Sequence, residues 1–140
     1  MNDRYPFVRQ KHSYDCGPAC LAMIFKYYNK CMELSEISFL AHTNYQGTNI
    51  INMCNLCKHM GVLAMAIKIS KAAFYEDFTL PCIAQVCKGT NHHFVVIYEK
   101  NIFSVIIADP GCGIKKLHII NFLRCFSGTL ILLEPVLKRL

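Results

Sequence analysis

The stretch Gln10-Lys-His-Ser-Tyr-Asp-Cys16-Gly-Pro-Ala-Cys20 runs from a polar segment straight into an apolar one. The apolar residues that begin there recur at helical spacing and predict a helix over residues 17–29: Ala19, Leu21, Ala22, Ile24, Phe25 and Tyr28. Asp15 is a candidate N-cap for this helix, and Pro18 suits its first turn. The pattern therefore places Cys16 at the mouth of a helix.

A cysteine in this position is a candidate nucleophile. The free backbone N–H groups and the positive end of the helix dipole favour its thiolate, which is the reactive form. Cys20 lies one turn further in, where the dipole effect fades and the apolar stripe points the side chain toward the core. Cys16 is therefore preferred.

A thiolate nucleophile needs a base within hydrogen-bond reach, and the base needs a group that orients it. His93 leads one apolar strand, and Asp109 closes the next. Two antiparallel strands joined by a turn at Lys100 would put the start of the first beside the end of the second. We therefore expect His93 and Asp109 to be neighbours, with His92 on the opposite face of its strand.

Gln10 lies six positions before Cys16. Its side-chain amide could donate a hydrogen bond to the oxyanion that forms when a thiolate attacks a carbonyl group. A lone glutamine is more often a surface residue. The residues by themselves leave both interpretations open.

The remaining pattern predicts an α+β fold, with N-terminal helices packed on a C-terminal antiparallel sheet. A short helix is expected from Ser35, which would cap it, and a third from Asn49 to His59, ending before Gly61. Later apolar and β-branched runs predict five strands, over residues 62–69, 83–86, 94–99, 105–108 and 129–133. A brief helix is expected over residues 119–126.

The length of 140 residues and the absence of a linker or repeat predict a single domain over residues 1–140. The longest apolar run, residues 94–108, is interrupted by Glu99-Lys100-Asn101, so no membrane span is expected. The N-terminus has no apolar core of the kind that a secretory signal contains. We therefore expect a soluble domain that stays in the cytoplasm.

The nine cysteines are odd in number and irregular in spacing, which argues for free thiols in a reducing compartment. Four of them have apolar neighbours and are expected in the core: Cys20, Cys82, Cys87 and Cys125. Cys54 and Cys57 have CxxC spacing, which by itself is weak evidence for zinc or a redox pair. Packing on one helix face is the favoured interpretation, and no metal is expected.

The formal charge of +6 could suit nucleic acid, an anionic membrane surface or an acidic peptide. The Lys and Arg residues are scattered rather than clustered, so the charge selects none of these partners.

Several motifs together resemble the C39 peptidase domain, which stands at the N-terminus of bacterial ABC exporters of bacteriocins, lantibiotics and quorum peptides. The resemblance covers nearly the whole chain and rests on these motifs: Gln10-x5-Cys16, Asp15-Cys16-Gly17-Pro18-Ala19-Cys20-Leu21-Ala22-Met23, His93-Phe94-Val95-Val96, Asp109-Pro110 and Gly128. It implies a papain-like cysteine protease that removes leader peptides after a double-glycine (Gly-Gly or Gly-Ala) site. By this match Cys16 is the nucleophile, His93 the base and acid, Asp109 the orienting group and Gln10 an oxyanion donor.

The resemblance also implies partners. The leader peptide would bind as an amphipathic helix in a shallow apolar groove, and its acidic character would suit the basic chain. The parent transporter would supply membrane-spanning and ATPase domains, which places the peptidase at the cytoplasmic side of the bacterial membrane. The isolated domain is expected to be monomeric and to need no cofactor or nucleic acid. The ending Leu137-Lys138-Arg139-Leu140 has the look of an excised domain.

Two other classes of function stay open. A degenerate relative in some toxin exporters lacks the catalytic cysteine and only docks substrate, an interpretation that the presence of Cys16 disfavours. A zinc or nucleic-acid binding module would need metal on Cys54 and Cys57, or an affinity for nucleic acid that falls with salt.

Overall fold

The computed structural model describes residues 4–136, and the expectation about residues 137–140 lies outside this range. Three helices come first in the chain: α1 (Cys16–Tyr27), α2 (Leu34–Leu40) and α3 (Ile50–His59). Five strands and a short 3₁₀ helix follow: β1 (Val62–Lys68), η1 (Ala73–Tyr75), β2 (Cys82–Lys88), β3 (Asn91–Lys100), β4 (Ser104–Asp109) and β5 (Gly113–His118). Helix α4 (Ile119–Cys125) and strand β6 (Phe126–Pro135) complete the described fold.

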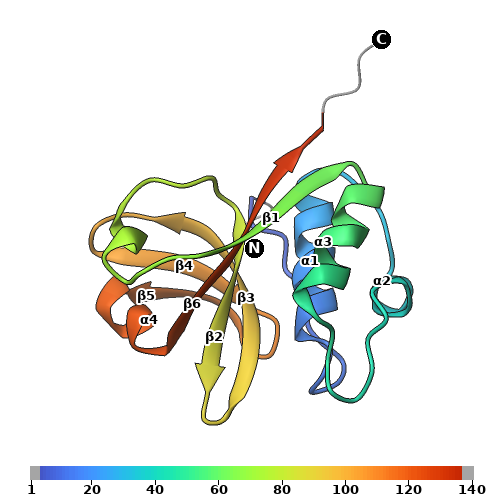
Figure 1. Cartoon of the computed structure of the whole chain (residues 1–140), viewed down its shortest axis with the longest axis horizontal. Helices are drawn as coiled ribbons and strands as arrows, with labels where there is room; N and C mark the ends of the chain where they lie inside the picture. The colour runs from blue at the N-terminus through green and yellow to red at the C-terminus, as the bar shows by residue number, and fades with distance from the viewer. Residues whose placement is uncertain (1–3, 137–140) are drawn as a thin grey trace.

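The strands form one antiparallel sheet in the order β1-β6-β2-β3-β4-β5. The last strand, β6, therefore lies between β1 and β2 and joins the strand that follows the helices to the hairpin of β2 and β3. In Figure 1, α1, α2 and α3 gather on one side of the molecule, and α4 lies with β4 and β5 on the other. The β2–β3 hairpin is thereby placed beside the first helix.

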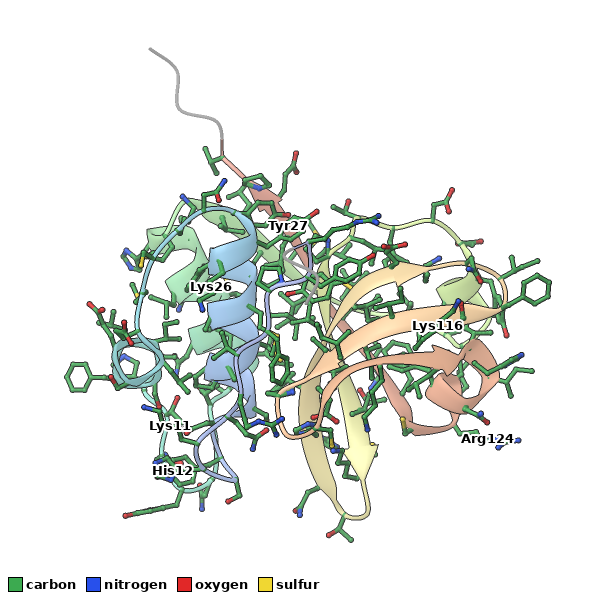
Figure 2. The ribbon with its side chains drawn as sticks, turned by 180° about the vertical axis from the view of Figure 1, so that it is seen from behind. Lys11, His12, Lys26, Tyr27, Lys116 and Arg124 are labelled. Carbon is green, nitrogen blue, oxygen red and sulfur yellow. The ribbon has the colours of Figure 1, made fainter. Side chains whose placement is uncertain are left out.

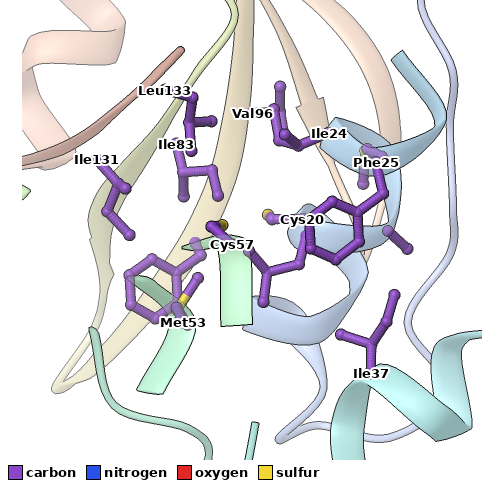
Figure 3. Close-up of a cluster of buried hydrophobic side chains, with 14 of the residues drawn as sticks. Cys20, Ile24, Phe25, Ile37, Met53, Cys57, Ile83, Val96, Ile131 and Leu133 are labelled. Carbon is purple, nitrogen blue, oxygen red and sulfur yellow. The ribbon is translucent and has the colours of Figure 1, made fainter. Parts of the chain in front are cut away.

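Side chains from the two faces of the sheet enter two separate cores. The larger core packs α1, α2 and α3 against one face and includes Cys20, Phe25, Ile37, Met53, Ile83 and Val96 (Figure 3). The smaller core lies on the other face, under α4 and η1, and includes Phe74, Ala84, Val95, Ile97 and Phe122. Neighbouring residues of β2 and β3 alternate between the cores, as the two-residue period of a strand requires.

Helix α1 is the central helix, because every residue from Cys16 to Phe25 is buried. Asp15 occupies its N-cap position but does not cap it; Oδ2 instead accepts a hydrogen bond from the His12 N–H at 3.0 Å. A Cβ on Gly17 would lie 2.7 Å from Thr48 Cγ2, so only glycine lets the start of α1 approach the segment before α3 this closely. Cys16 thus sits where two segments are tightly packed.

Most expected elements are confirmed, with one wrong helix cap and one missed strand. Helix α3 is capped by Asn49, whose Oδ1 accepts the Asn52 N–H at 2.8 Å. The expected cap at Ser35 is wrong: α2 begins at Leu34, which is buried on the same face as Ile37. The strand β5 was not expected at all.

The predicted burial of the four cysteines is right for two of them. Cys20 and Cys82 are fully buried, whereas Cys87 is exposed and Cys125 half-buried. Cys87 follows Val86, the last residue of β2 that pairs with β6, so it lies beyond the covered part of the sheet. It is therefore wrong to count Cys87 and Cys125 as core residues.

The surface of the described chain carries its charge in a scattered way. Figure 2 labels Lys11, Lys26, Lys116 and Arg124, which stand on four different parts of the fold. Within residues 4–136, no helix has both the length and the hydropathy to cross a bilayer.

Candidate active site

Cys16 is the first residue of α1 and borders a cavity of about 910 Å³. One wall of this cavity comes from the start of α1 and from the segment leading into α3, and includes Tyr14, Tyr45 and Ile51. The opposite wall is the β2–β3 hairpin, which includes Lys88 and His93. Cys16 itself is only 9% exposed, so it faces a cleft rather than the open surface.

His93 and Asp109 are in direct contact. The Nε2 atom of His93 lies 2.7 Å from Oδ1 of Asp109, and both residues are buried. The contact follows from the antiparallel pairing of β3 with β4, in which Val96 lies opposite Ala108. Because the acceptor is a carboxylate, Nε2 carries the proton, which leaves Nδ1 as the ring nitrogen for a hydrogen bond with Cys16.

The His93 ring is held in its charged form. Burial by itself would lower the pKa of His93, but hydrogen bonds with Asp109 and Cys16, and the negative charges of both, raise it to about 9. Burial would raise the pKa of Asp109, but hydrogen bonds from His93, the Gly111 N–H and Lys88 hold it well below its usual range. A charged imidazolium therefore lies within hydrogen-bond reach of Cys16.

Asp109 has two further partners in addition to His93. The backbone N–H of Gly111 donates to Oδ1 at 2.8 Å, and the ammonium of Lys88 donates to Oδ2 at 3.0 Å. Lys88, which ends β2 just before the turn at Gly89, was not singled out from the sequence. The one sequence signal is its place just before that turn, on the hairpin that carries His93.

Gln10 lies beside Asp109 rather than on the cavity wall. Its backbone N–H donates to the Pro110 carbonyl oxygen at 2.9 Å, and its Nε2 donates to the His12 carbonyl oxygen at 2.8 Å. The side-chain Oε1 is buried and has no hydrogen-bond partner among the described residues. One N–H of Nε2 remains available for another acceptor, because an amide nitrogen carries two.

The other cysteines and the neighbouring histidine are placed differently. Cys20 is fully buried, and burial together with the charges of Cys16 and Asp109 raises its pKa well above the usual value. It is thus unsuited to act as a thiolate. His92 also borders the cavity, but it is exposed, whereas His93 is buried and contacts Asp109.

The CxxC pair of α3 contributes to the packing of the larger core. Cys57 is fully buried, which raises its pKa to about 12, and Cys54 is half-buried against the same core. Among residues 4–136, no group of three or more His, Cys, Asp or Glu side chains has the arrangement of a metal site.

Comparison with known proteins agrees with this geometry. The family described as "Peptidase C39 family" matches residues 4–138. The chain is 34% identical over 125 residues to the transport/processing ATP-binding protein ComA of Streptococcus pneumoniae, which covers 86% of this chain and 17% of ComA. It is 30% identical over 130 residues to the lactococcin-G-processing and transport ATP-binding protein LagD of Lactococcus lactis, covering 91% of this chain and 18% of LagD.

A solved structure shares the same fold. It is the crystal structure of a double glycine motif protease from an AMS/PCAT transporter in complex with the leader peptide, with a TM-score of 0.88 and 27% identity. The match covers 96% of this chain and 94% of that one. The expected α+β, papain-like fold is confirmed. The chain spans less than a fifth of the length of ComA and of LagD, but it matches 87% of the length of an uncharacterized protein of Methanothermobacter marburgensis, to which it is 27% identical over 127 residues.

Proposed function

Since this chain belongs to the Peptidase C39 family and is therefore a cysteine peptidase, we propose that it removes the leader peptide from a bacteriocin or lantibiotic precursor. Cleavage follows a double-glycine (Gly-Gly or Gly-Ala) site and is coupled to export. The observation that carries this proposal is that Cys16 and His93 border one cavity and that His93 also contacts Asp109, although the three residues come from different elements.

The proposed roles follow from the contacts. His93 takes the thiol proton of Cys16, and Asp109 keeps the resulting imidazolium oriented through its contact with Nε2. The Cys16 thiolate attacks the carbonyl carbon of the second glycine, and a tetrahedral oxyanion forms. The oxyanion accepts hydrogen bonds that are donated by the Cys16 backbone N–H at the start of α1 and by the free N–H of Gln10 Nε2.

The second half of the reaction uses the same groups in reverse. The oxyanion collapses, the peptide C–N bond breaks, and His93 donates its proton to the leaving amine. The leader then remains attached to Cys16 as a thioester. Neutral His93 then takes a proton from water, and the resulting hydroxide attacks the thioester carbonyl. The C–S bond breaks, which restores the Cys16 thiolate beside the His93 imidazolium, and the new carboxyl group of the leader releases its proton to solvent.

The leader peptide would lie along the aromatic wall of the cavity. Tyr14 stacks on His12 with ring centroids 5.0 Å apart and meets Tyr45 edge-on at 5.4 Å. Tyr45 and Ile51 are 89% and 71% exposed, so they offer apolar surface next to Cys16. Such a surface suits the apolar face of an amphipathic helix. The formal net charge of +6 would favour capture of acidic leaders.

The setting of the reaction is also a proposal. ComA and LagD are transport and processing ATP-binding proteins, of which this chain covers less than a fifth. We infer that membrane-spanning and ATPase domains work with this peptidase at the cytoplasmic side of the bacterial membrane, and that the peptidase domain by itself is monomeric and needs no cofactor.

The test is cleavage of synthetic precursor peptides with a double-glycine site, followed by mass spectrometry. The chain should cut after the second glycine, Cys16→Ala should not cut, and Cys31→Ala, which removes an exposed thiol, should match the wild type. A precursor with leucine in place of the second glycine should resist cleavage. Binding of several such precursors by the folded chain without any cleavage would refute the proposal and indicate a docking module.

A further inference from the structure

The β2–β3 hairpin brings a second charged side chain to the active site. Val86 lies opposite His93, and Lys88 follows Val86 by two residues, so Lys88 and His93 are diagonal neighbours on one face of the hairpin. Both side chains contact the carboxylate of Asp109, His93 at Oδ1 and Lys88 at Oδ2. One short element thus supplies two of the groups that fix this carboxylate.

We propose that Lys88 is a positioning residue of the active site, whose ammonium holds the Asp109 carboxylate in the rotation that presents Oδ1 to His93 and offsets the charge of Asp109. The inference rests on the proposed function of the site and adds a fourth residue to it. Lys88 acts through Asp109 and need not touch the substrate.

The distribution of contacts on the carboxylate supports a role in orientation. Oδ1 accepts two hydrogen bonds, from His93 at 2.7 Å and from the Gly111 N–H at 2.8 Å. Within the described chain, the recorded contact of Oδ2 is the one from Lys88 at 3.0 Å. Rotation about the terminal bond of an aspartate is soft, so a contact at each oxygen fixes the carboxylate better than contacts at one oxygen alone.

Lys88 and Asp109 differ in exposure, so the effect of Lys88 on orientation can be measured separately from its effect on stability. The side chain of Lys88 is 50% exposed and that of Asp109 is 5% exposed. A pair with one end in water is screened and contributes little to the free energy of folding. Loss of Lys88 should therefore leave the fold intact and change the reactive geometry.

Lys88 also balances the charges of the active-site groups. In the reactive state Cys16 and Asp109 are negative, and His93 and Lys88 are positive, so the four groups sum to zero. Without Lys88 the remaining three groups carry one net negative charge, which disfavours this charge-separated state of the cluster. Burial lowers the pKa of Lys88, but the hydrogen bond and charge of Asp109, with smaller contributions from Cys112 and Cys16, raise it above its ordinary value.

The experiment compares Lys88→Met, Lys88→Arg and a matched control, Lys116→Met, which removes an exposed lysine from β5 (Figure 2). The first readout is the rate at which iodoacetamide alkylates Cys16 at pH 7, followed by fragmentation mass spectrometry of the peptide over residues 12–26. The second is kcat and KM for a double-glycine precursor. Thermal unfolding reports whether each variant is folded.

We expect Lys88→Met to slow both alkylation and kcat by roughly tenfold while KM stays within about twofold of the wild type. Lys88→Arg keeps the charge and the donor and should remain within about threefold of the wild type. Lys116→Met should change neither rate. If Lys88→Met does not fold, Lys88→Gln, which keeps a neutral donor, takes its place with the same expectation.

Two results would overturn the inference. Unchanged alkylation and kcat in the folded Lys88→Met variant would make Lys88 an ordinary surface lysine. A loss confined to KM would make it a substrate contact. Alkylation of Cys16 needs no precursor peptide, so a failure of the proposed substrate leaves this readout valid and separates the two failures.

Discussion

Replacing Asp109 with asparagine preserves the size of the side chain and removes its charge. Asp109 raises the pKa of His93 in two ways, by its hydrogen bond and by its charge, while burial of the ring lowers it. Without the carboxylate we expect the pKa to move from about 9 toward its ordinary value of 6.5. At pH 7 the protonated fraction of His93 would then fall from about 99% to about 24%, a roughly fourfold change.

Loss of protonation is therefore the smaller part of the expected effect. The larger part is the loss of an oriented ring, because general acid–base catalysis contributes about a hundredfold or more to the rate. We expect kcat/KM for Asp109→Asn at pH 7 to fall at least about a hundredfold. The alkaline limb of its pH profile should move down from near pH 9, where His93 loses its proton in the wild type, toward pH 7.

The assay is precursor cleavage measured from pH 5 to pH 10, with Asp77→Asn as a control that neutralises an exposed carboxylate. The control should retain the wild-type profile. An unchanged alkaline limb in Asp109→Asn would refute the reasoning, because it would show that Asp109 does not set the protonation of His93. A lowered limb with nearly normal kcat/KM at pH 6 would show that charge matters and orientation does not.

Three further predictions concern the stability of the fold and the capture of substrate. Because the pKa of His93 is higher in the folded than in the unfolded state, the stabilisation that His93 contributes is complete below about pH 6.5 and is lost as the pH rises through about 9. The melting temperature should fall over this range. The fall should be smaller in His93→Gln. Gly17→Ala should lower the free energy of unfolding in urea by about 1–3 kcal/mol, since its Cβ would lie 2.7 Å from Thr48 Cγ2. Adding Thr48→Ser, which removes that methyl group, should restore part of the loss, and no recovery would contradict the clash. Cleavage of acidic precursors should weaken as salt rises, and a flat response would argue against electrostatic capture.

The extent to which the fold could be predicted depends on how far each element is buried. Helix α1 has a continuous apolar stripe, and the central strands β2 and β3 are apolar on both faces because each face enters a core. Their positions could therefore be predicted from the pattern of apolar residues. Strand β5 lies at the edge of the sheet, and its adjacent residues Lys115 and Lys116 are both exposed. Its sequence therefore shows no alternation of apolar and polar residues. Lysines are common on edge strands because they discourage pairing with other chains.

A site residue could be predicted where its position along a helix or strand fixes the direction of its side chain. A helix start sets the surroundings of Cys16, and strand alternation with antiparallel pairing brings His93 to Asp109. Lys88 ends a strand at a turn, where its long side chain can take many directions, and only the position of Asp109 in space selects one. Charged contacts between residues far apart in sequence leave no periodic signal.

Gln10 illustrates the same limit and connects the parts of the site. It lies in an irregular segment, so a spacing of six from Cys16 fixes no direction for its amide. In the structure that segment is tied to the turn after β4 by two contacts, Gln10 N–H to the Pro110 carbonyl at 2.9 Å and Arg9 Nη1 to the Gly111 carbonyl at 3.2 Å. The same turn carries Asp109, and the Gly111 N–H donates to it. The candidate oxyanion donor and the group that orients His93 are therefore fixed by one turn, so a change in its shape would displace both at once.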